Sequence, residues 1–165
     1  MSNVLIRESQ ERDVSDIYNL VPNLAPLTPH TRYTYWNLFR NFANCCFIAV
    51  DEDQLIGFIT SHPTTSPPNE WFIWQAGVVP EYRGTGLIDV LQDCVIEVAR
   101  QKGALAINTS IETDNPRSLG AFNRMAVRLG TAMNEVIRFN LTPRDSSTPD
   151  EVLYRISLEA ENSSL

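Results

Sequence analysis

Hydrophobic and polar residues follow two recurring patterns along this chain, and the patterns divide it into short predicted elements. Alternation or a short apolar run is typical of strands, whereas apolar residues three and four positions apart are typical of helices. The first pattern predicts strands over residues 4–9, 45–51, 54–62, 70–79, 104–111, 135–141 and 151–158. The second predicts helices over residues 11–21, 32–42, 87 to a stop near 103, and 116–130.

Capping and turn residues mark the ends of several of these elements. Asp13 is a candidate N-cap of the first helix, and Pro116 suits the first turn of the last one. The polar residues 63–69 and 142–150 are expected to be loops. Strands alternate with helices in the middle of the chain and pair as hairpins at both ends. This order predicts an α/β fold, with a mixed, mostly antiparallel central sheet and helices on both faces.

Composition narrows the class of protein only a little. With 165 residues, the chain has the length of one domain, so residues 1–165 are expected to form a single domain. A composition of 43% hydrophobic and 20% charged residues is ordinary for a soluble globular protein. A net charge of −7 and the lack of a Lys/Arg cluster disfavour a nucleic-acid partner.

The cysteines and histidines suggest neither a disulfide framework nor a metal site. Cys45 and Cys46 are adjacent and Cys94 is the third, so free thiols in a reducing compartment are expected. His30 and His62 are isolated, and no metal-ligand spacing is present, so no metal is predicted. No apolar run has the length of a membrane span and the first residues do not resemble a signal peptide. A cytoplasmic protein without a membrane partner is therefore expected.

The segment VVPEYRGTGLID, residues 78–89, places two glycines between a predicted strand and a predicted helix. This arrangement presents backbone N–H groups and a helix N-terminus to an anion. A P-loop needs a lysine after the glycines, and a dinucleotide fingerprint needs a glycine where Asp89 stands, so both are excluded. A turn that needs glycine only for its backbone angles remains the alternative.

The same segment resembles the first motif of the GNAT superfamily of acyl-CoA-dependent N-acetyltransferases. Its pattern V-x-P-x-x-[QR]-x-x-G-x-[GA] is matched by Val78, Pro80, Arg83 and Gly86, with Ile88 at the last small position. The resemblance implies that acetyl-CoA is the cofactor and that loop amides bind its pyrophosphate. It also implies that the preceding strand bulges, so that its backbone pairs with the pantetheine arm. The implied cofactor-binding residues are Ala76, Gly77 and Val78 for the pantetheine arm, and Arg83, Gly84, Thr85, Gly86 and Leu87 for the pyrophosphate.

A second GNAT motif, N-x-x-[AS]-x-x-x-[YF], lies on the last predicted helix. Asn115, Ser118 and Phe122 match it, which adds Asn115 and Phe122 to the implied cofactor-binding residues. Many family members have tyrosine at the last position, where it protonates the departing thiolate. Phenylalanine has no hydroxyl group, so that proton must come from water, Tyr33 or another donor.

A narrower resemblance covers nearly the whole chain. The segments APLTPHTRYTYWNLFRNF, FIWQAGVVPEYRGTGL and TSIETDNPRSLGAFNRMAVRLG are similar to segments of the L-2,4-diaminobutyrate acetyltransferases of ectoine biosynthesis. The WQ pair in the second segment is unusual among GNAT proteins. The resemblance implies transfer of acetyl from acetyl-CoA to the 4-amino group of diaminobutyrate, a small-molecule amine substrate.

Amine acetylation needs a positioned thioester, a neutral amine and stabilisation of an oxyanion. The resemblance assigns the backbone amide of Val78 to the thioester carbonyl. It assigns Trp74 and Tyr33 to the acceptor, with Tyr33 donating a hydrogen bond. By strand alternation Trp74 shares a face with Phe72 and Ala76, and a core position for Trp74 or a packed helix position for Tyr33 is the alternative.

Two carboxylates are candidates for binding the ammonium group or removing its proton. Glu151 opens the last predicted strand and matches a family glutamate near the substrate amine. Glu112 directly follows the predicted strand of residues 104–111. An exposed strand-end glutamate is the alternative for Glu151. Thr28 stands where the family has an aspartate that helps to hold the charged substrate.

This departure leaves other functions open. Another small amine or a peptide N-terminus is the second enzymatic hypothesis, and a non-catalytic acyl-CoA-binding GNAT domain is the third. Residues 151–158 are also expected to form an edge strand suited to a homodimer.

Overall fold

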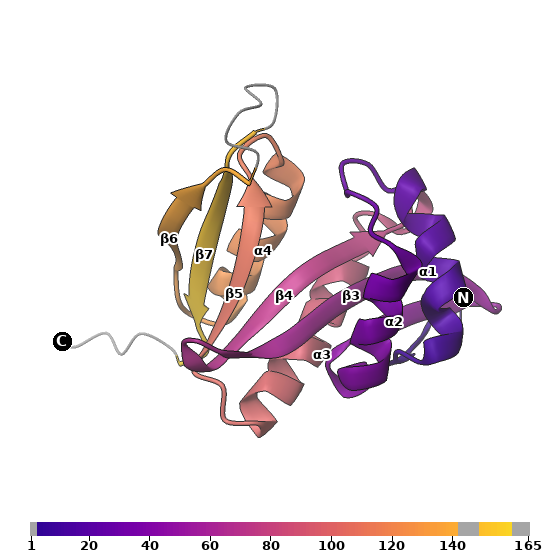
Figure 1. Ribbon diagram of the computed structural model, residues 1–165, viewed down its shortest axis with the longest axis horizontal. Helices are drawn as coiled ribbons and strands as arrows, with labels where there is room; N and C mark the ends of the chain where they lie inside the picture. The colour runs from indigo at the N-terminus through magenta and orange to yellow at the C-terminus, as the bar shows by residue number, and fades with distance from the viewer. Residues whose placement is uncertain (1–2, 142–148, 160–165) are drawn as a thin grey trace.

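The computed structural model describes residues 3–141 and 149–159, which form one sheet flanked by helices (Figure 1). The seven strands of the described residues lie in the order β1-β2-β3-β4-β5-β7-β6. Their bounds are β1 Leu5–Glu8, β2 Phe47–Asp51, β3 Gln54–Thr65, β4 Pro68–Val78, β5 Ala106–Glu112, β6 Met133–Phe139 and β7 Glu151–Ser157. The helices are α1 Val14–Leu20, α2 Arg32–Asn41, α3 Leu87–Gln101 and α4 Pro116–Arg128.

The predicted fold class is confirmed. β4 and β5 are parallel, whereas the other neighbouring strands are antiparallel. Helices α3 and α4 bury Leu91, Val95 and Met125 against one face of the sheet. Helices α1 and α2 bury Ile17, Tyr35 and other side chains against the opposite face of β2 and β3. The helices therefore cover both faces, as the alternation of elements predicts.

The sheet is forked between β4 and β5. β4 pairs with β3 as far as Val78, but it pairs with β5 only over Glu70–Ile73. Beyond Ile73 the two strands diverge, and Figure 1 shows β5, β7 and β6 as one arm and β4 and β3 in the other, which β2 and β1 continue. The last residues of β4 therefore have a strand partner on one side only.

A β-bulge lies at the point where the fork opens. Thr60 pairs with Gln75 and Ser61 pairs with Ile73, so Trp74 is an extra residue in β4. Such a residue reverses the alternation of the strand beyond it. Trp74 packs against the α1/α2 core, whereas Ala76 packs against the α3/α4 core. The prediction that Trp74 and Ala76 share a face is therefore wrong.

Two other local predictions also need correction. Residues 63–69 are mostly strand, because β3 runs to Thr65 and β4 begins at Pro68. The last strand, β7, lies between β5 and β6, so β6 and not β7 is the edge strand on this side of the sheet. The predicted loop over residues 142–150 lies mostly outside the described residues.

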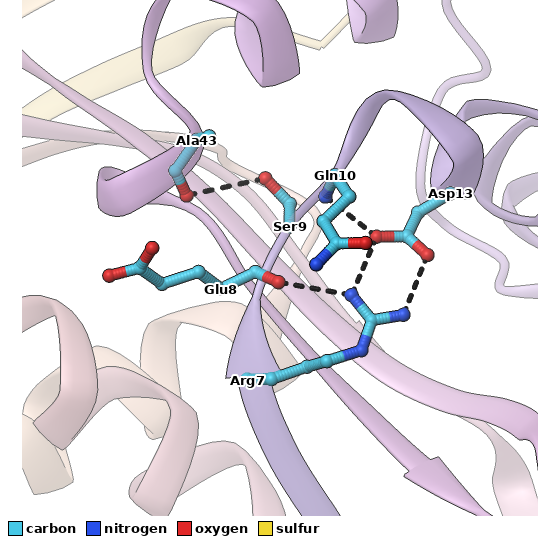
Figure 2. A network of polar contacts seen from close by, with 6 residues as sticks. All are labelled: Arg7, Glu8, Ser9, Gln10, Asp13 and Ala43. Atoms are coloured by element: carbon cyan, nitrogen blue, oxygen red, sulfur yellow. Dashed lines mark hydrogen bonds and ion pairs between the residues drawn. The ribbon is translucent and has the colours of Figure 1, made fainter.

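The entry into α1 depends on a buried carboxylate. Figure 2 shows that Asp13 accepts a bidentate pair of hydrogen bonds from Arg7, at 2.8 and 2.9 Å, and one from the Gln10 amide at 2.7 Å. Asp13 thus reaches back to the preceding turn and does not cap α1 with its side chain. Since Arg7 belongs to β1, the pair holds the first helix against the first strand.

Candidate active site

The glycine turn, residues 83–87, has backbone angles that only glycine adopts readily. Gly84 and Gly86 have φ values of +76° and +85°. A Cβ atom at either position would meet nothing within 4 Å, so the space in front of the turn is open. The Thr85 hydroxyl donates to the Tyr82 carbonyl at 2.7 Å and holds the turn in place. The turn therefore combines a fixed backbone with room for a ligand.

Helix α3 begins directly at this turn. Gly86 is its N-cap, and its carbonyl accepts from the amides of Asp89 and Val90 at 3.0 and 3.1 Å. The first N–H groups of a helix have no partner within the helix, and the helix dipole favours an anion there. Arg83 adds a cation at the same end of the fork, because its Nε donates to the Val78 carbonyl at 3.2 Å. An exposed helix start beside a cation is an arrangement that suits a phosphate group.

Beyond Ile73, the edge of β4 that faces the fork has no neighbouring strand to bind its backbone groups. The amide of Val79 donates to the Ile56 carbonyl at 2.9 Å, and hydrogen-bonded and non-hydrogen-bonded pairs alternate along an antiparallel ladder. The Val78–Gly57 and Ala76–Ile59 pairs are therefore non-hydrogen-bonded. The N–H groups of Ala76 and Val78 and the C=O group of Ala76 then point away from β3 into the fork, where an extended amide chain can pair with them, whereas the Val78 carbonyl accepts from Arg83.

The second motif lies on α4. The side chain of Asn115 caps this helix by accepting from the Ser118 amide at 3.1 Å. Phe122 is 6% exposed and belongs to the core beneath α3 and α4. Ile88 is half-buried against the same core, so its side chain packs inward from the first turn of α3.

The predicted acceptor residues Trp74 and Tyr33 line one groove of about 530 Å³ between α2 and the sheet. Tyr33 is 71% exposed and is not a core residue. Trp74 is half-buried, whereas Trp71 is a core residue at 2% exposure. The rings of Tyr33, Phe42, Phe72 and Trp74 can attract a cation in this groove. The full lining is Tyr33, Thr34, Asn37, Leu38, Phe42, His62, Phe72 and Trp74.

The connection between α1 and α2, residues 24–31, lies along the open end of β4. A Cβ atom at Gly77 would lie 2.8 Å from side-chain carbons of Leu24 and Leu27, so glycine allows this close approach. The His30 ring lies 4.4 Å from the Trp74 ring, centroid to centroid. Thr28 contributes its carbonyl, which accepts from Gln75 Nε2 at 2.8 Å, while its side chain is exposed.

The two predicted carboxylates are neighbours on the other arm of the fork. Glu112 of β5 pairs directly with Glu151 of β7. Strand alternation places Glu112 on the face of Asn108, and Asn108 pairs with Phe72 of β4. Both carboxylates therefore face the same side of the sheet as the aromatic groove. Burial raises the pKa of Glu112, and repulsion by Asp114 and Glu151 raises it further.

A comparison with protein families agrees with this geometry. The family model described as acetyltransferase (GNAT) family matches residues 12–126, which is more than half of the chain. The chain belongs to the GNAT family of acetyltransferases. The predicted family and enzyme class, an acetyl-CoA-dependent N-acetyltransferase, are therefore confirmed.

Relatives of this GNAT protein share one description. The chain is 30% identical over 156 residues to the L-2,4-diaminobutyric acid acetyltransferase of Halomonas elongata, covering 94% of this chain and 81% of the relative. It is also 30% identical over 154 residues to the protein of the same name from Chromohalobacter salexigens, covering 93% and 80%. The predicted resemblance to diaminobutyrate acetyltransferases is confirmed over most of the chain.

Solved structures of GNAT proteins share its fold. The diaminobutyrate acetyltransferase of Paenibacillus lautus, in complex with L-2,4-diaminobutyric acid and coenzyme A, superposes with a TM-score of 0.87 at 23% identity, covering 95% of this chain and 96% of that one. The ribosomal-protein-S18-alanine N-acetyltransferase of Escherichia coli superposes with a TM-score of 0.76 at 15% identity, covering 98% of each.

Several site residues of this GNAT protein were not predicted from the sequence. Gln75 and His30 hold the 24–31 connection, and Asn37, Phe42 and His62 line the groove. The unusual WQ pair was a signal for Gln75, but its contacts depend on the bulge. Within residues 3–141 and 149–159, no helix has the length and apolar character of a membrane span, and no cluster of metal-binding side chains is present.

Proposed function

We propose that the chain transfers the acetyl group of acetyl-CoA to the 4-amino nitrogen of L-2,4-diaminobutyrate, as one acetyltransferase domain. The observation that carries the proposal is the arrangement around the fork. Glu112 and Glu151 face the same side as the Trp74 groove, and the open end of β4 lies between these two walls. The similarity to diaminobutyrate acetyltransferases over 94% of the chain supports this choice of acceptor.

The residues on the cofactor side fit coenzyme A. The glycine turn of residues 83–87 suits the pyrophosphate, and the fork-facing backbone of Ala76 and Val78 suits the amides of the pantetheine arm. When bound, acetyl-CoA supplies the acetyl thioester. The amide of Val78 points into the fork, where it can donate to the thioester carbonyl as negative charge develops on its oxygen.

The residues on the acceptor side fit a small cationic amino acid. Trp74 and Tyr33 offer aromatic faces to an ammonium group, and Glu151 offers a carboxylate. The aspartate expected at position 28 is absent, and Thr28 presents its carbonyl to Gln75. We propose that the Glu112–Glu151 pair supplies the negative charge that Thr28 lacks.

The same carboxylates are the proposed acceptors of the proton that the substrate nitrogen loses. As the carbon–nitrogen bond forms and the carbon–sulfur bond breaks, Glu151 accepts the proton that the attacking nitrogen loses. Glu112 is the direct neighbour of Glu151 in the β5–β7 ladder, and burial raises the pKa of Glu112. Phe122 has no hydroxyl group and is buried, so the leaving thiolate takes its proton from water or from Tyr33.

The test is release of free thiol from acetyl-CoA, measured across a panel of diaminobutyrate, ornithine, lysine, putrescine and an alanine-initiated peptide. We expect diaminobutyrate to have the highest kcat/KM by at least about tenfold, because the acceptor site holds a short diamino acid. A higher kcat/KM for the peptide would favour N-terminal acetylation. Tight acetyl-CoA binding without turnover of any amine would indicate a non-catalytic domain.

The role of Glu151 can be tested in the same assay. Glu151→Gln is expected to lower kcat by about 10²-fold, the ordinary contribution of a general base, and to change the dissociation constant of acetyl-CoA little. Glu97→Gln changes an exposed glutamate on α3 and is the matched control. Equal losses of turnover and acetyl-CoA affinity in Glu151→Gln would remove Glu151 from the acceptor site.

We also propose a homodimer and a cytoplasmic location. β6 is the edge of the sheet, and its Val136 and Ile137 are 54% and 55% exposed, so a second copy can pair there. The cysteines Cys45, Cys46 and Cys94 are free thiols, which suits a reducing compartment. Light scattering is expected to give twice the monomer mass, and a Val136→Lys variant is expected to give the monomer mass.

A further inference from the structure

Gln75 occupies a place in the fork that the proposed function does not explain. It follows the bulge residue Trp74 and is 7% exposed. The backbone N–H of Gln75 donates to the Thr60 hydroxyl at 3.1 Å, and that hydroxyl donates to the backbone carbonyl of Gln75 at 3.2 Å. The backbone of Gln75 is therefore anchored to β3, and the bulge turns its side chain toward α1 and α2.

The side chain of Gln75 makes two hydrogen bonds to different segments. Oε1 accepts from the hydroxyl of Tyr35, which is 1% exposed, at 2.9 Å. Nε2 donates to the carbonyl of Thr28 at 2.8 Å. Gln75 thus joins the open end of β4 to helix α2 and to the 24–31 connection. Loss of either partner leaves a polar group without a hydrogen bond at a buried position, which is costly.

The 24–31 connection carries the contacts that shape the acceptor side. Leu24 and Leu27 close over Gly77, and the His30 ring lies against Trp74. We propose that Gln75 is a positioning residue, which holds this connection on β4 through Thr28 and thereby sets the position of Trp74 in the acceptor groove. Its side chain does not line the groove, so it acts through the connection and not by touching the acceptor.

Gln75→Glu distinguishes the contributions of the two hydrogen bonds of the Gln75 side chain, because it keeps one and removes the other. A carboxylate of the same size still accepts from Tyr35 but cannot donate to the Thr28 carbonyl, and two acceptors then face each other. Tyr35→Phe is the comparison variant: it removes the bond from the Tyr35 hydroxyl to Gln75 Oε1 and the contact of that hydroxyl with the His30 backbone, and it leaves the Gln75–Thr28 bond in place. Gln75→Met removes both bonds with little change in volume, and it serves if Gln75→Glu does not fold.

The first experiment needs no substrate. Hydrogen–deuterium exchange is measured by mass spectrometry on a peptide covering residues 24–34 and on a control peptide covering 87–101. In Gln75→Glu and in Gln75→Met we expect at least about tenfold faster exchange in 24–34 and unchanged exchange in 87–101. Unchanged exchange in 24–34, or equal acceleration in both peptides, would overturn the proposal. This result is independent of whether diaminobutyrate is the acceptor.

The second experiment rests on the proposed function and uses the amine that gives the highest turnover. Gln75→Glu is expected to raise the KM for the amine at least about tenfold and to change the KM for acetyl-CoA less than about threefold, whereas Tyr35→Phe has a smaller effect on both. Burial raises the pKa of the introduced carboxyl group, and its protonated form can donate to Thr28 again. The ratio of amine KM between Gln75→Glu and wild type should therefore fall from pH 8 to pH 6. A ratio independent of pH, with equal rises in both KM values, would indicate general destabilisation and contradict the positioning role.

Discussion

At the residue scale, the glycines of the turn meet two different requirements, a positive φ angle and open space in front of the backbone. Gly84 and Gly86 both need positive φ, yet nothing in the described chain fills the space in front of them. A Cβ at Gly86 would thus be opposed by the backbone angle and by a bound ligand, but not by neighbouring side chains. The family motif is explained by both needs together.

Gly86→Glu tests the ligand contact at this turn. We expect at least a tenfold loss of acetyl-CoA affinity, about 1.4 kcal/mol, because a carboxylate would lie where phosphate groups bind. Gly103→Glu is the matched control, since Gly103 has φ of +78° with open space around it and lies beyond the other end of α3. Isothermal titration calorimetry on the two variants measures the difference. Similar acetyl-CoA affinities in both would refute the assignment of the turn.

Glu112 gives a prediction on stability and pH. Its pKa is raised in the folded chain, so the folded state binds more protons than the unfolded state between the ordinary pKa and the raised one. The free energy of unfolding then falls as pH rises through this window. Glu112→Gln should raise Tm relative to wild type at pH 7.5, and this gain should vanish near pH 4.

The control for this effect is Glu97→Gln, at an exposed position on α3. Differential scanning calorimetry of both variants from pH 4 to pH 7.5 is the measurement. A constant Tm difference across this range in Glu112→Gln would show that burial and repulsion at Glu112 do not oppose its ionisation.

At the element scale, the fork depends on β4 having different partners along its length. The bulge at Trp74 turns Trp74 and Gln75 toward α1 and α2, and it turns Ala76 and Val78 toward α3. The parallel pairing with β5 ends at Ile73, just before this bulge. One strand thus provides a wall of the Trp74 groove and, a few residues later, the backbone edge proposed for the cofactor.

Gly77→Ala tests the contact between this strand and the 24–31 connection. The added methyl would lie 2.8 Å from the ends of Leu24 and Leu27 and 3.3 Å from the Phe58 ring. Because the leucine ends can move, we expect a loss of stability of about 1 kcal/mol, the low end for overpacking. The displaced connection should raise the KM for the amine severalfold. Leu27→Ala in the same chain removes one obstructing side chain and should restore part of the KM. Strictly additive effects of the two changes would contradict the contact.

Most elements could be predicted from the sequence because their periods are local. The α3 stripe and the short apolar runs of β2 and β3 indicate their type without tertiary information. The resemblance implies a bulge in this strand, but its place at Trp74 could not be predicted, because an extra residue in β4 is defined by its register with β3. For the same reason the faces of Ala76 and Gln75 were not predictable. Asp13 has the residue type of an N-cap, but its pairing with Arg7 needs β1 and α1 side by side.

The candidate site could be predicted in part. The glycine turn and Asn115 are local motifs, and both lie at helix N-termini as expected. The pairing of Glu112 with Glu151 brings together residues far apart in the sequence, and only the antiparallel β5–β7 register shows it. The roles of these carboxylates and of Tyr33 and Trp74 stay predictions.

At the scale of the whole molecule, the two arms of the sheet divide the work of the proposed reaction. The arm from β4 to β1 carries the glycine turn, the Trp74 groove and the 24–31 connection, whereas the arm of β5, β7 and β6 carries the two carboxylates (Figure 1). Relatives named for diaminobutyrate match both arms, since the similarity spans 94% of the chain. The proposed acceptor site uses residues from both arms.

The most direct test of the proposed reaction is the structure of its product. Purified protein is incubated with acetyl-CoA and L-2,4-diaminobutyrate, and the acetylated nitrogen is identified by two-dimensional NMR. We predict acetylation at the 4-amino group only, with loss of product in Gly86→Glu and its retention in Gly103→Glu. Acetylation at the 2-amino group, or no product while another amine is acetylated, would contradict the proposed function.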